Sequence, residues 1–92
     1  MPLFEDYLKN ANILAQEVVD AWGLNVNAGN ASFLTPEFLD VFEKACRYQQ
    51  AATLAESYRS LNALSEEAAQ GEDTARRTFL DAYKPWAEKH NS

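Results

Sequence analysis

Apolar residues recur every three or four positions along most of the chain, which is the spacing of one face of an α-helix. In the first segment these positions are Phe4, Tyr7, Leu8, Ala11, Leu14, Ala15, Val18 and Trp22. Pro2 suits a first helical turn, and Gly23 suits a helix end because glycine readily takes the left-handed backbone conformation. The pattern therefore predicts a helix over residues 2–22.

The second segment carries the clearest helix start in the chain. Thr35 is a good N-cap and Pro36 is a good first helical residue. Neither glycine nor proline follows until position 71, so the pattern predicts one long helix over residues 36–70. Several weak helix formers in residues 57–65 leave a break open there.

Turn-forming residues separate these helices from each other and from a third. Residues 24–34 contain three Asn and one Gly, so we expect a connector, packed onto the bundle by its apolar side chains. Gly71 separates the second helix from a third, predicted over residues 73–90. Pro85 is expected to kink or end that helix, because proline lacks the backbone N–H that a helix interior needs.

The composition fits an all-α fold. The 92 residues include 15 Ala but only one Ile, four Val and four Thr, which favours helix over sheet. We expect a single domain over residues 1–92, built as a small three- or four-helix bundle with a long second helix. A straight second helix would leave apolar surface for a second copy to cover, which favours a homodimer, whereas a bent one gives a monomer.

The net charge of −6 limits the partners. Phosphate-bearing partners need positive charge, so direct binding to nucleic acid or to an anionic membrane is disfavoured. No apolar run reaches membrane-helix length, and acids occupy the position of a signal peptide's basic end, so we expect a cytoplasmic protein. Cys46 and His90 are single copies of their types, which excludes an internal disulfide and a Cys/His zinc site.

Two sets of residues are candidates for partner binding. The negative charge falls within residues 1–71, and there we expect an acidic face. Its members are Glu17, Asp20, Glu37, Asp40 and Glu43. Trp86 follows the expected helix break at Pro85, so we expect it to be incompletely buried and to serve as an aromatic anchor for the partner.

The sequences Glu17-Val-Val-Asp20 and Glu37-Phe-Leu-Asp40 support an alternative. If the first two helices form an antiparallel hairpin, the four carboxylates meet at one end, where oxygen ligands could hold Mg²⁺. This arrangement is weakly similar to the all-α nucleoside triphosphate pyrophosphohydrolases, and the resemblance implies a Mg²⁺-dependent hydrolase. It covers only these two segments and departs from the family pattern, which has more Glu and nearby basic residues for phosphate.

The sequence orients no Ser, His and acid toward a shared catalytic site, so we expect no enzyme and no cofactor. The leading hypothesis is a non-enzymatic acidic protein that binds and regulates or inhibits a partner protein. The docking surface on that partner is expected to be basic, such as a nucleic-acid-binding groove. A second alternative is a structural subunit of a larger assembly.

Overall fold

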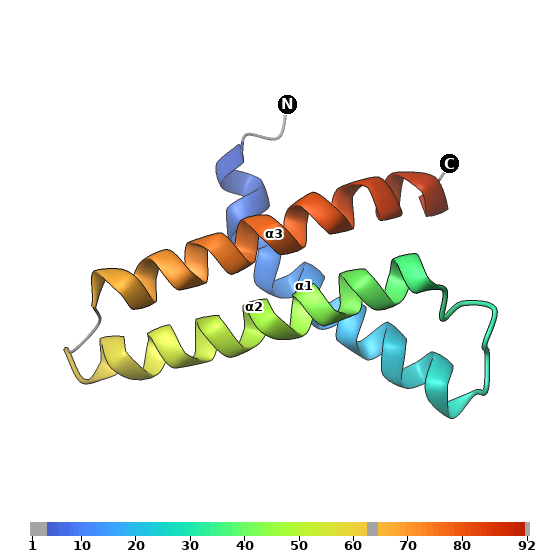
Figure 1. Cartoon of the computed structure of the whole chain (residues 1–92), viewed down its shortest axis with the longest axis horizontal. Coiled ribbons are helices and arrows are strands. Elements are labelled where there is room, and N and C mark those ends of the chain that lie inside the picture. The colour runs from blue at the N-terminus through green and yellow to red at the C-terminus, as the bar shows by residue number, and fades with distance from the viewer. Residues whose placement is uncertain (1–3, 63–64, 92) are drawn as a thin grey trace.

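The computed structural model describes the backbone over residues 4–62 and 65–91 and the side chains over residues 10–62 and 65–89. Within these ranges the chain forms three helices and no strand (Figure 1). Helix α1 spans Phe4–Asn27, α2 spans Pro36–Ser60 and α3 spans Glu66–Asn91. The three helices pack together, which confirms the all-α prediction.

Helices α2 and α3 lie side by side in opposite directions and form a hairpin (Figure 1). The chain leaves α2 through Asn62, whose φ of 53° is left-handed, a conformation that Asn tolerates better than most residues. The break left open within residues 57–65 is therefore present. The single long helix over residues 36–70 is wrong, because the segment after the turn belongs to α3.

The start of α3 has a cap that the sequence analysis missed. The Ser65 side-chain oxygen accepts a hydrogen bond from the Ala68 backbone N–H at 3.1 Å, and two acids, Glu66 and Glu67, occupy the first turn. Both features stabilise the positive end of a helix. The third helix consequently begins at Glu66 instead of residue 73, and Gly71 lies inside it.

Helix α1 also extends further than predicted, because Gly23 does not end it. The helix continues to Asn27, and the left-handed residue is Gly29, with a φ of +67°. The connector is correspondingly shorter than residues 24–34. Phe33 and Leu34 in it pack against the core as expected.

Pro85 neither ends nor caps α3, which continues for six residues to Asn91. Of the kink or end expected at Pro85, the end is therefore not found. The expected start of α2 is confirmed, because the Thr35 side-chain oxygen accepts a hydrogen bond from the Phe38 backbone N–H at 3.2 Å. Thr35 thus satisfies one of the backbone donors left free at a helix start.

Helix α1 crosses one face of the hairpin obliquely (Figure 1) and contacts α2 more than α3. The rings of Trp22 and Phe42 stack with their centroids 4.7 Å apart. The core lies where the three helices meet and combines alanines with a few large side chains. Its buried members are Ala11, Ala15, Val18, Phe38, Val41, Ala45, Tyr48, Phe79 and Leu80.

Candidate functional site

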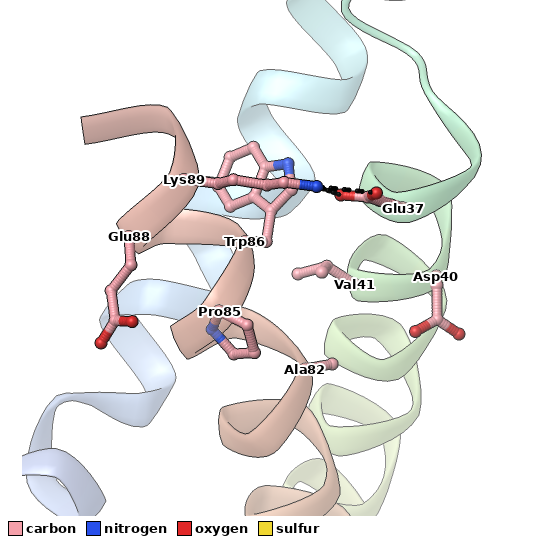
Figure 2. A pocket seen from close by; sticks show the side chains of 8 residues that line it. All are labelled: Glu37, Asp40, Val41, Ala82, Pro85, Trp86, Glu88 and Lys89. Atoms are coloured by element: carbon pink, nitrogen blue, oxygen red, sulfur yellow. Dashed lines mark hydrogen bonds and ion pairs between the residues drawn. The ribbon is translucent and has the colours of Figure 1, made fainter. Parts of the chain in front are cut away.

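A hollow of about 630 Å³ lies between the first turns of α2 and the last turns of α3 (Figure 2). Its apolar part includes the buried Val41 and the half-buried Trp86. Charged side chains reach it from both helices. Among the residues whose side chains are described, the lining is Glu37, Asp40, Val41, Ala82, Pro85, Trp86, Glu88 and Lys89. Three residues predicted for partner binding, Glu37, Asp40 and Trp86, therefore line one hollow.

An ion pair joins the two sides of this hollow. Figure 2 shows Lys89 reaching from α3 to Glu37 on α2. The Lys89 Nζ lies 3.1 Å from Glu37 Oε1 and 3.3 Å from Oε2. Both side chains are well exposed, at 67% and 60%. Water screens such a pair, so it contributes only about 0–1 kcal/mol to the free energy of unfolding.

Trp86 is fixed in place by the aromatic core behind it. Its ring centroid lies 5.3 Å from that of Phe38 and 6.1 Å from that of Tyr83. Phe33 from the connector meets it edge to face at 6.3 Å. The indole is thus half-buried and pre-oriented, and it presents a rigid apolar wall to the hollow.

The other two acids predicted on α2 have basic neighbours one helical turn away. Asp40 pairs with Lys44 at 2.8 Å, and Glu43 pairs with Arg47 at 2.7 Å. Glu43 does not line the Trp86 hollow, but a second hollow nearer the turn between α2 and α3. The three acids predicted on α2 are therefore divided between two hollows.

The two acids predicted on α1, Glu17 and Asp20, are exposed and line neither of these hollows. Asp20 accepts a hydrogen bond from Gln16 at 2.8 Å, and Gln16 in turn accepts one from Gln49 on α2 at 3.0 Å. The five acids predicted for partner binding thus do not line one hollow. Helix α1 crosses the hairpin, so its acids are not brought to the Trp86 hollow.

The geometry required by the Mg²⁺ alternative is not observed. Within residues 10–62 and 65–89, no three acidic, Cys or His side chains gather closely enough to hold a metal ion. Instead Glu37 faces Lys89 and Asp40 faces Lys44. The hairpin assumed for that site was between the first two helices, whereas the one observed joins α2 and α3.

Arg76 forms a polar cluster that the sequence analysis did not identify. Its Nε donates to the hydroxyl of the buried Tyr48 at 3.4 Å, and its guanidinium carbon lies 5.5 Å from the centre of that ring. Its Nη2 lies 3.6 Å from Glu72. Burial lowers the pKa of Arg76, but Tyr48, Glu72 and Asp73 together outweigh it and raise the pKa. The Arg76 side chain therefore stays charged. Its hydrogen bond to Tyr48 joins α3 to α2 and stabilises their packing.

Cys46 lies half-buried on α2. Burial raises the pKa of its thiol, so less of the reactive thiolate is present at neutral pH than in a free cysteine. This environment is the opposite of one that activates a nucleophile.

No known protein family matches the chain, and no curated protein or solved structure shows significant similarity to it. None of the helices in the described part of the chain is long and apolar enough to cross a membrane.

Proposed function

We propose that this chain is a non-enzymatic protein that binds and regulates or inhibits a partner protein by docking on a basic surface of that partner. One observation carries the proposal. Glu37 and Asp40, proposed from charge, and Trp86, proposed as an aromatic anchor, line the same hollow. A rigid aromatic wall beside exposed carboxylates suits a partner's Arg or Lys side chain, which has an apolar stem and a cationic head.

The Lys89–Glu37 pair suggests how such a side chain would bind. Lys89 already places an ammonium against Glu37 at the edge of the hollow. Because this exposed pair is weak, a cation from the partner competes with it at little cost. An Arg offers two parallel N–H donors to the carboxylate, which a Lys cannot do. The overall charge of −6 would speed the encounter with a basic surface.

Affinity capture from native-host lysate tests the proposal. The tagged chain at low salt is expected to retain one stoichiometric basic protein and to lose it at high salt. Replacing Glu37→Gln together with Asp40→Asn should release that protein. The matched control is Glu66→Gln with Glu67→Gln, which removes the same charge from exposed positions at the far end of the hairpin.

Two results would refute this proposal. Salt-resistant binding would remove its electrostatic basis and favour a structural subunit. Equal loss of binding in both double variants would show that net charge matters and the hollow does not.

We also propose that the chain self-associates, because its surface is large for its mass. Its accessible area is 6327 Å². A compact monomer of 10.3 kDa exposes about 5,400 Å². The radius of gyration of 14.4 Å likewise exceeds the roughly 12 Å expected for a compact chain of this length.

A further inference from the structure

One face of the α2–α3 hairpin is covered by α1 and the opposite face is not. On the covered side, Asn12 of α1 lines a crevice together with residues of α2 and α3 such as Thr53 and Arg76. On the opposite side, two hollows follow the seam between α2 and α3, and none of the α1 residues whose side chains are described, from residue 10 onward, lines either of them. The Trp86 hollow is one of these, and the other lies nearer the turn.

In the half of this open face nearer the turn, the lining residues on α3 are uncharged, whereas those on α2 are Glu43, Lys44 and Arg47. The residues on α3 are also small, and a Cβ added to Gly71 would meet nothing within 4 Å, so the space above it is open. On α2 the stripe that begins with Lys44 continues at seven-residue intervals to Ala51 and Tyr58, which keeps these positions on nearly the same side of the helix. We call this surface the turn-side face. It consists of Ala51, Tyr58, Gly71, Thr74, Ala75 and Thr78.

One large side chain is exposed on this face, because Tyr58 is 40% exposed. The small residues opposite it on α3, Gly71, Thr74 and Thr78, would let another helix approach the α3 backbone closely. The combination of protruding and small side chains is self-complementary, as an interface between identical subunits requires.

The area of the chain fits this arrangement. The accessible surface exceeds that of a compact monomer by roughly 900 Å². A standard protein interface buries about 800 Å² on each partner. Burial of one interface of ordinary size would therefore reduce the accessible surface of each chain to about that of a compact monomer.

We infer that a second copy of this chain packs against the turn-side face, in an antiparallel arrangement about a twofold axis. The inference rests on the proposed self-association and names its surface. Charge favours the antiparallel direction. A parallel pair would bring Lys44 and Arg47 near the same residues of the second copy, whereas an antiparallel pair places them toward its Tyr58 end, where α3 begins with Glu66 and Glu67. The Trp86 hollows then remain open at opposite ends of the dimer.

Light scattering coupled to size-exclusion chromatography tests the inference, with the full chain loaded from 10 μM to 1 mM. The unaltered chain is expected at twice 10.3 kDa at the higher concentrations. Thr74→Arg with Thr78→Arg places two large cations on the interface and should raise the dimer dissociation constant at least tenfold. The matched control is Gln50→Arg with Ser57→Arg, two exposed positions on the outer side of α2, which should leave the mass unchanged.

The outcomes separate the two claims. A single-chain mass at every concentration would overturn both self-association and its surface. A dimer that survives the Thr74 and Thr78 substitutions would overturn the surface alone. Circular dichroism of both double variants checks that helix content is retained, because each substituted residue is exposed in the monomer.

Discussion

Replacing Phe38→Ala should be among the most destabilising single changes in the described core. Phe38 is fully buried, and its ring lies 4.7 Å from that of Phe33 and 5.3 Å from that of Trp86. A buried Phe removes about 200 Å² from water, which at about 25 cal/mol per Å² corresponds to about 5 kcal/mol. Ala retains part of this, so the expected loss in the free energy of unfolding is roughly 3–4 kcal/mol.

That loss is a large share of the total stability. A domain of 92 residues is stable by about 5–14 kcal/mol, so the variant keeps its fold only if the parent lies above the lower limit. Urea denaturation followed by circular dichroism measures the change as a shift in the midpoint. Phe38→Leu retains most of the apolar volume and should lose about 1–2 kcal/mol, which keeps the comparison measurable if the Ala variant unfolds.

The neighbouring Leu39 supplies the control. Leu39 lies on the same helix but is 40% exposed, so Leu39→Ala should cost less than about 1 kcal/mol. If Leu39→Ala shifts the midpoint as much as Phe38→Ala does, the burial pattern of α2 is wrong. The packing that orients Trp86 in the hollow would then be wrong as well.

Three further predictions concern the cap of α2, the proline inside α3 and the thiol of Cys46. Thr35→Ala removes the cap on the Phe38 N–H and should lower the free energy of unfolding by about 1 kcal/mol in urea; no change would show that the cap is dispensable. Pro85→Ala restores a backbone N–H donor inside α3 and should raise the free energy of unfolding by about 1–3 kcal/mol. A lower free energy of unfolding would show that the proline is needed for packing. Because the pKa of Cys46 is raised, its alkylation by iodoacetamide at pH 8 should be slower than that of free cysteine, and equal rates would refute the burial. Because burial penalises the thiolate, the fold should also lose stability as the pH rises above about 8.5, the ordinary pKa of cysteine, toward the higher folded-state pKa.

The sequence indicated the helical class and the faces that pack, but not all the ends of the helices. Periodicity identified the apolar face that includes Ala11, Ala15 and Val18, all of which are core residues, because burial of apolar area dominates the free energy of folding. The helix ends expected at Gly23, Gly71 and Pro85 are not found, because each of these residues lies inside a helix. A penalty of about 1–3 kcal/mol for such a residue is smaller than the packing gained by extending the helix.

The turn after α2 and the candidate site could not be predicted from the spacing of apolar residues along the chain. The reversal at Asn62 requires a left-handed residue, and the local signals for the next helix were the capping oxygen of Ser65 and the two acids that follow it. The hollow depends on how the first turns of α2 meet the last turns of α3. Glu37 and Lys89 are 52 residues apart in the chain, so no spacing rule relates them.

The position of the hollow determines which substitutions can test its function. Trp86 contributes to both the core and the hollow, since three aromatic rings pack on it. Removing it would change stability and partner binding together. Glu37 contributes an exposed ion pair of about 0–1 kcal/mol, so Glu37→Gln leaves the fold almost unchanged. Lys89→Gln removes the internal competitor for Glu37. A partner that inserts a cation beside Trp86 should therefore bind this variant more tightly than it binds the parent. A partner that docks elsewhere should bind the variant no better than the parent.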